Sequence, residues 1–144
     1  MTVLFADTSA LFKWYISEAH SDDVDALFSR QSWVAISQLA GLELRSALGR
    51  RRRSKQLTSR VEKSVLDLFH THQQLGNLRV HPIDNNLCVE AERLMQAHPK
   101  IPLRTLDAMQ LAAAIIAGTP EFATADRIQA SAARAAGLLV YDFS

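Results

Sequence analysis

Near the start of the sequence lies Val3-Leu4-Phe5-Ala6-Asp7-Thr8-Ser9, and the architecture expected for the whole chain follows from this segment. A short apolar run stops at an acid, which two hydroxyl residues follow. Four consecutive apolar residues with polar neighbours are typical of a strand that is buried on both faces, as in a parallel sheet. Because open α/β folds place their ligands at the carboxyl edge of such a sheet, Asp7 is predicted to lie where an acid can do chemistry. Thr8 or Ser9 is predicted to cap the helix that follows.

Short apolar runs and amphipathic stretches alternate along the rest of the chain. Because parallel strands are joined by helical crossovers, this alternation predicts a mainly parallel sheet with helices on both faces. Pro82 predicts that the third strand lies at an edge of the sheet or ends there, since proline cannot donate to a strand ladder. The expected strands are residues 3–6, 33–36, 78–83, 122–124 and 138–141, and the expected helices are residues 9–17, 21–28, 38–49, 58–75, 85–98, 103–118 and 127–136.

The composition is that of an ordinary globular protein. A chain of 144 residues suits one domain with a single core, and 48% hydrophobic with 22% charged residues excludes a disordered chain. No run approaches the roughly 18 uninterrupted apolar residues of a membrane helix, and the first residues lack the features of a signal peptide. The lone Cys88 excludes an internal disulfide and is predicted to be a small buried residue. We therefore expect a cytoplasmic protein without a membrane partner.

Three further acids occupy positions that could bring them to the same sheet edge as Asp7. Glu43 has apolar or small neighbours at helical spacing, so it is predicted to share the inward face of its helix. Asp107 lies in the first turn of the helix that Thr105 is predicted to cap, and Asp126 follows a short apolar run. Four carboxylates gathered there would repel one another, so that some pKa values would rise or a cation would enter. Oxygen ligands without histidine or thiolate predict Mg²⁺ or Mn²⁺, and carboxylate-held metal ions are a recurrent device for phosphodiester hydrolysis.

Structural explanations also exist for these acids. In a purely structural role, Glu43 would lie at the edge of the buried helix face with its carboxylate in solvent. Asp107 would only complement the positive end of a helix dipole. A different enzyme class, the aspartyl phosphatases, usually needs a second acid two residues after the first, where this chain has Ser9.

A basic segment follows the helix that carries Glu43. The net charge is only +1, but the basic residues are concentrated here, after Gly49, which is expected to end the helix. Stabilising the negative end of one helix dipole requires fewer basic residues than this segment contains. One interpretation is that the segment contacts phosphate groups, and the other is that it forms a solvated face or a surface for a protein partner. Arg104 is a further candidate for phosphate contact or for pairing with Asp107. The basic segment contains Arg50, Arg51, Arg52, Arg53 and Lys55.

Four segments, weak singly but specific together, resemble the PIN domain family and, within it, the VapC-like toxin ribonucleases of type II toxin–antitoxin pairs. They occur in the order typical of the family and span nearly the whole chain. The matching segments are Phe5-Ala-Asp-Thr-Ser-Ala-Leu, Ser37-Gln-Leu-Ala-Gly-Leu-Glu-Leu, Leu103-Arg-Thr-Leu-Asp-Ala-Met-Gln-Leu-Ala-Ala-Ala and Ala123-Thr-Ala-Asp-Arg.

The resemblance implies a three-layer α/β/α sandwich in which residues 1–144 form a single PIN domain. It implies an endoribonuclease that uses Mg²⁺ or Mn²⁺, dimerises, and is blocked by a cognate antitoxin protein in a hetero-oligomer. Some relatives carry an additional acid just after the fourth, whereas Arg127 follows here. The alternative is a non-catalytic PIN-fold protein that sequesters RNA or a protein partner. The resemblance assigns Asp7, Glu43, Asp107 and Asp126 to the metal-binding quartet, and Thr124 and Ser9 to supporting hydrogen bonds.

Overall fold

A five-stranded sheet forms the centre of the molecule in the computed structural model, which describes residues 4–144. Every strand pairs in parallel with its neighbours, in the order β3-β2-β1-β4-β5, so the predicted parallel sheet is confirmed. Residue 3, the predicted start of the first strand, lies outside the described residues. The strands are β1 Leu4–Ala6, β2 Val34–Ser37, β3 Leu78–His81, β4 Glu121–Thr124 and β5 Leu139–Asp142.

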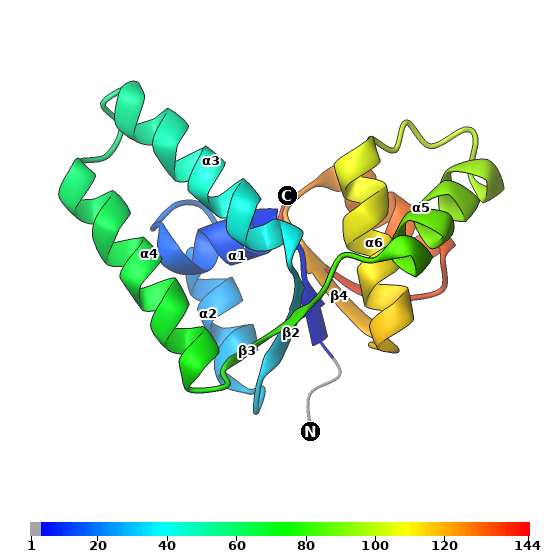
Figure 1. Ribbon diagram of the computed structural model, residues 1–144, viewed down its shortest axis with the longest axis horizontal. Coiled ribbons are helices and arrows are strands. Elements are labelled where there is room, and N and C mark those ends of the chain that lie inside the picture. Colours follow the sequence, from blue (N-terminus) through cyan, green and yellow to red (C-terminus); the bar gives the residue numbers. More distant parts are fainter. Residues whose placement is uncertain (1–3) are drawn as a thin grey trace.

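Helices cover both faces of this sheet and complete the predicted three-layer α/β/α sandwich (Figure 1). The first four helices of residues 4–144 pack on one face, and the last three pack on the other. None of the helices within this range combines the length and the apolar content that crossing a membrane requires. The helices are α1 Thr8–Tyr15, α2 Ser21–Ser29, α3 Leu39–Arg53, α4 Ser59–Gln74, α5 Asn85–Ala97, α6 Thr105–Ala117 and α7 Arg127–Ala135.

Side chains of the strands alternate between two hydrophobic cores. In β1, Leu4 and Ala6 belong to the core beneath α1–α4, whereas Phe5 belongs to the core beneath α5–α7. Phe5 pairs in register with Phe122 of β4, and their rings stack with centroids 5.8 Å apart. Burial on both faces explains why the central strand β1 is continuously apolar and why β2 departs from this only at Ser37.

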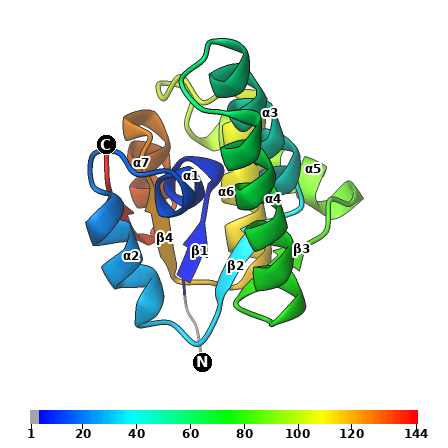
Figure 2. The same cartoon turned by 90° about the vertical axis from the view of Figure 1, so that its left-hand side faces the viewer.

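The strand order places the ends of β1 and β4 side by side (Figure 2). The backbone N–H of Asp7 continues this ladder and donates to the carbonyl of Ala123 at 3.1 Å. Asp7 and the end of β4 therefore share the carboxyl edge of the sheet. At the far side, β3 is an edge strand that ends at His81, as Pro82 predicted.

Helix starts differ from those expected from the sequence. Asp7, and not a following hydroxyl residue, caps α1, because its Oδ1 accepts the backbone N–H of Ala10 at 3.1 Å. Arg104, and not Thr105, is the N-cap residue of α6, and it makes no side-chain capping hydrogen bond. In both cases several polar residues compete for the cap, and the backbone path decides among them.

Two further expectations are wrong. The helix predicted to end at Gly49 continues to Arg53, because arginine is a good helix former and a single glycine in a helix interior costs only about 1 kcal/mol. Cys88 is exposed and not buried, because the inward positions of α5 are taken by Leu87 and Ala91.

Candidate active site

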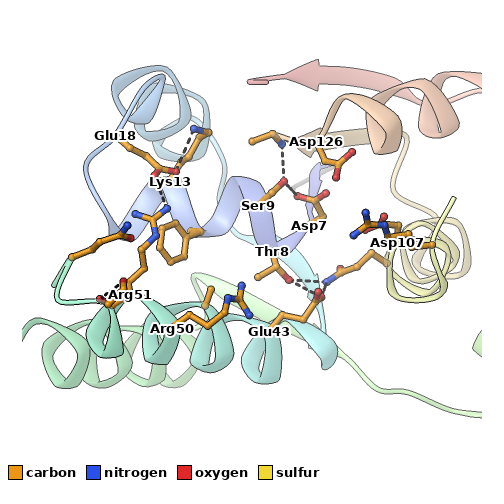
Figure 3. Close-up of a pocket in the computed structure, with 17 residues that line it drawn as sticks. Asp7, Thr8, Ser9, Lys13, Glu18, Glu43, Arg50, Arg51, Asp107 and Asp126 are labelled. Atoms are coloured by element: carbon orange, nitrogen blue, oxygen red, sulfur yellow. Dashed lines mark hydrogen bonds and ion pairs between the residues drawn. The ribbon is translucent and has the colours of Figure 1, made fainter. Parts of the chain in front are cut away.

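A cavity of about 760 Å³ lies at the carboxyl edge of the sheet, and all four predicted acids line it (Figure 3). Asp7 follows β1, and Glu43 projects from α3. Asp107 lies in the first turn of α6, and Asp126 caps α7. Four segments that are distant in sequence thus contribute one acid each, because crossover connections between parallel strands begin at this edge.

The carboxylate of Asp7 is buried and held on both oxygens. Its Oδ1 accepts hydrogen bonds from Ser9 Oγ at 2.7 Å and from the backbone N–H of Ala10 at 3.1 Å. Its Oδ2 accepts from Thr124 Oγ1 at 2.6 Å. Burial raises the pKa of Asp7 to about 6, against the lowering effect of these hydrogen bonds, and the charge of Asp107 adds to the rise. The orientation of the Asp7 carboxylate is therefore fixed, and within residues 4–144 no basic side chain forms an ion pair with it.

Thr124 and Ser9, the predicted supporting residues, connect the ends of β1 and β4. Thr124 Oγ1 accepts the backbone N–H of Asp126 at 3.0 Å while it donates to Asp7. Ser9 Oγ accepts the backbone N–H of Ala125 at 2.7 Å and lies 3.3 Å from Thr124 Oγ1. These hydrogen bonds fix two of the acids relative to each other through one hydroxyl group.

Glu43 is held by two residues that the sequence analysis did not assign to the site. Thr8 Oγ1 donates to Glu43 Oε1 at 3.0 Å, and Gln110 Nε2 donates to the same oxygen at 2.7 Å. Gln110 Nε2 also lies 2.8 Å from Thr8 Oγ1, and its residue is only 2% exposed. The available signal was a lone amide in the apolar body of α6, three residues after Asp107 and hence on the same helix face.

Electrostatic repulsion links the acids that no hydrogen bond joins. Burial raises the pKa of Asp107, and the charges of Asp126 and Glu43 raise it further, whereas Arg104 lowers it. The backbone carbonyl of Asp107 accepts from Gln129 Nε2 at 2.9 Å, which ties the start of α6 to α7. The end of the cavity that these four acids line is therefore a region of concentrated negative charge.

The donor set fits a divalent cation by charge and by ligand type. Carboxylate oxygens are the ligands that Mg²⁺ and Mn²⁺ prefer, and a cation would offset the repulsion between acids that adds to the effect of burial on the pKa values of Asp7 and Asp107. Within residues 4–144, however, no three His, Cys, Asp or Glu side chains are close enough together to form a ready-made metal site. Mg²⁺ usually retains several waters and binds one or two carboxylates directly, so a complete protein cage is not required.

The predicted basic residues divide between two faces of α3. Arg52 points away from the cavity and pairs with Glu62 at 2.7 Å. With Arg53 it lines a separate hollow of about 470 Å³. Lys55 follows the end of α3 in a left-handed conformation, with φ of 63°, and does not line the acidic cavity. The predicted basic residues that do line the acidic cavity are Arg50, Arg51 and Arg104.

The fold and the cavity define a parallel α/β/α protein with an acid-lined site at the carboxyl edge of its sheet. The PIN domain profile matches residues 4–135, and this chain belongs to the PIN domain family, a family of nucleases. The resemblance expected from the sequence segments is thereby confirmed. No curated protein sequence matches the chain.

Solved structures with the same fold cover almost the entire chain. VapC20 of Mycobacterium tuberculosis, described as a sarcin–ricin loop cleaving toxin, is 19% identical, with a TM-score of 0.72 over 94% of this chain and 96% of that one. FitAcB of Neisseria gonorrhoeae is 16% identical, with a TM-score of 0.69 over 96% of each chain. VapBC2 of Rickettsia felis, bound to a promoter DNA fragment, is 14% identical, with a TM-score of 0.68 over 98% of this chain and 99% of that one. At these identities the likeness shows a shared fold.

Proposed function

We propose that this protein is a metal-dependent endoribonuclease that hydrolyses RNA phosphodiester bonds with Mg²⁺ or Mn²⁺. The observation that carries the proposal is the convergence of Asp7, Glu43, Asp107 and Asp126 on one cavity. Membership of a nuclease family supports the reaction class. Burial is the main cause of the raised pKa values of Asp7 and Asp107, and repulsion between the acids adds to both; this added repulsion supports a cation requirement, because a bound cation would relieve it.

The side chains have distinct roles in this proposal. Asp7, Asp107 and Asp126 would hold the cation directly or through water, and Glu43 would help to bind it or orient the attacking water. When bound, a divalent cation supplies a nucleophilic water at neutral pH and stabilises charge on the phosphoryl group. Both hydrogen bonds to Glu43 end on Oε1, so within the described residues Oε2 is the oxygen available to hold that water.

We propose further that the ribonuclease acts in the cytoplasm as the toxin of a type II toxin–antitoxin pair. Two of the similar structures are VapBC and FitAB toxin–antitoxin complexes, which supports a protein partner for this chain as well. A cognate antitoxin would neutralise the toxin by covering the acidic cavity, in a homodimer of the toxin or a toxin–antitoxin hetero-oligomer. Mapping RNA ends after a pulse of expression would identify the target, and growth that continues without new RNA ends would contradict a toxin role.

The central experiment compares two aspartate variants of the purified protein. Asp107→Asn should abolish Mn²⁺-dependent cleavage of single-stranded RNA while the protein stays folded, because it removes one of the cavity charges. Asp67→Asn is the matched control, since Asp67 is exposed and its carboxylate pairs with Lys63 on the surface of α4. Full cleavage by the Asp107→Asn protein would rule out the assignment of the acids.

One observation favours the non-catalytic alternative, in which the fold sequesters RNA or a protein without cutting. The described part of the chain holds no preformed group of three metal ligands. Calorimetric titration with Mn²⁺ distinguishes the two functions. Binding that Asp107→Asn weakens supports the nuclease, and the absence of any binding favours the sequestering protein.

A further inference from the structure

A cationic lobe lies at the end of the cavity opposite the acids of α6 and α7 (Figure 3). It is formed by Lys13 of α1 with Arg50 and Arg51 of α3. The cavity-lining positions of α3 recur at helical spacing, so one face of this helix runs from Glu43 to the lobe. With a rise of 1.5 Å per residue, Arg51 lies roughly 12 Å from Glu43 along the helix axis.

An internal carboxylate already lies between two of these cations. Glu18 Oε1 is 3.3 Å from Lys13 Nζ, and Glu18 Oε2 is 3.3 Å from Arg51 Nη2. Each oxygen thus contacts a different cation. An anion that bridges a lysine and an arginine in this way has the geometry and the charge of a phosphate group held by both.

Neither cation depends on Glu18 for its position. Lys13 Nζ also donates to the carbonyl of Ala19 at 2.9 Å. The Arg51 guanidinium lies 4.8 Å from the centroid of the Phe12 ring, which supports it by a cation–π contact. Removing the charge of Glu18 would therefore leave both cations in place and unneutralised.

The third cation of the lobe has no acidic partner within residues 4–144. Arg50 Nη1 donates to Ser46 Oγ at 3.0 Å, which orients the guanidinium without neutralising it. With Lys13, Arg51 and Glu18 included, the lobe holds three positive charges and one negative charge. A net charge of about +2 remains for a polyanion that enters the cavity.

We infer that this lobe is a phosphate subsite for a nucleic acid strand, and that Glu18 occupies it in the free protein. The inference rests on the proposed function, because it names where the RNA substrate would be held. The phosphate that binds here flanks the scissile bond, since the lobe is separated from the acids. Glu18 competes with it and so lowers the affinity for RNA.

The test is the Glu18→Gln variant, which keeps the size of the side chain and removes its charge. Glu62→Gln is the matched control. Glu62 of α4 also pairs with an arginine of the basic segment, Arg52, but this arginine lies on the face of α3 that is outside the acidic cavity. Binding of a short fluorescent single-stranded RNA is measured in EDTA, so that no cleavage occurs. Circular dichroism checks that both variants are folded.

Glu18→Gln should bind this RNA about fivefold more tightly at low salt, the effect of one partly exposed charge. The slope of log affinity against log salt should steepen by about 0.7, the value for one additional phosphate on a single strand. Glu62→Gln should match the wild type. Unchanged or weaker RNA binding by Glu18→Gln would overturn the inference. The inference would also fail if the substitution changed the affinity for a protein partner and left the affinity for RNA unchanged. Because no metal is present, this outcome is independent of whether Asp107→Asn still cleaves RNA.

Discussion

Replacing Asp7 by asparagine should stabilise the metal-free protein at neutral pH while it removes RNA cleavage. The folded protein raises the pKa of Asp7 from 3.8 to about 6, chiefly because the carboxyl is buried. Each unit corresponds to 1.36 kcal/mol, so keeping the ionised group in its site costs roughly 3 kcal/mol above pH 6. Asparagine has no charge to bury and avoids this cost.

The sign of the effect follows from proton binding. Between pH 3.8 and about 6 the folded protein keeps the proton of Asp7 and the unfolded chain has lost it. The free energy of unfolding of the wild type therefore falls as pH rises through this window, and the full cost is present above it. The variant loses one favourable contact, because the hydroxyl of Thr124, which donates to Oδ2, must turn to accept from an amide. This loss is about 1 kcal/mol, which leaves a net gain of about 2 kcal/mol at neutral pH.

Urea unfolding in EDTA measures this difference at about pH 4 and about pH 7.5. The Asp7→Asn protein should be slightly less stable than the wild type at the lower pH and more stable at the higher pH. Asp67→Asn controls for the chemical change at an exposed position and should stay within about 0.5 kcal/mol of the wild type. A difference between Asp7→Asn and wild type that is the same at both pH values would refute the reasoning about burial.

Two further substitutions test the supports of the site and of the fold. Gln110→Met should weaken Mn²⁺ binding by about 10- to 100-fold in calorimetry, because Glu43 loses a donor that holds Oε1 in place; an unchanged affinity would show that Gln110 only fills space. Thr58→Ala should lower the free energy of unfolding, measured in urea, by about 1 kcal/mol, because Thr58 Oγ1 caps α4 by accepting the backbone N–H of Val61. RNA cleavage by this variant should stay at the wild-type level. Loss of cleavage together with the stability would mean that α4 contributes to the site.

The fold could be predicted from the sequence because its signals are local and repeated. Short apolar runs alternate with amphipathic stretches, and Pro82 marks the edge strand that β3 proves to be. The acids could be proposed for one cavity because Asp7 and Asp126 each follow such a run, and parallel strands end at a common edge.

Other features depend on geometry that a linear pattern does not contain. Asp7 was predicted only as a site acid, yet the same carboxylate also caps α1. The basic segment divides between two faces because α3 continues through it, and an expected end at Gly49 concealed this division. The spacing of Gln110 from Asp107 indicates only a shared helix face; its hydrogen bond to Glu43 joins two segments that are distant in sequence, which no local pattern contains.

The length of α3 has a consequence for substrate choice. One unbroken helix carries Glu43 and Arg51. The separation between these two residues is therefore fixed by the rise of the helix. In the proposed function, an RNA strand would contact both ends only when its phosphates match that separation, and this match would determine which bond reaches the acids. Inserting one residue between them would rotate Arg51 by roughly 100° around the helix and uncouple the two ends without altering either side chain.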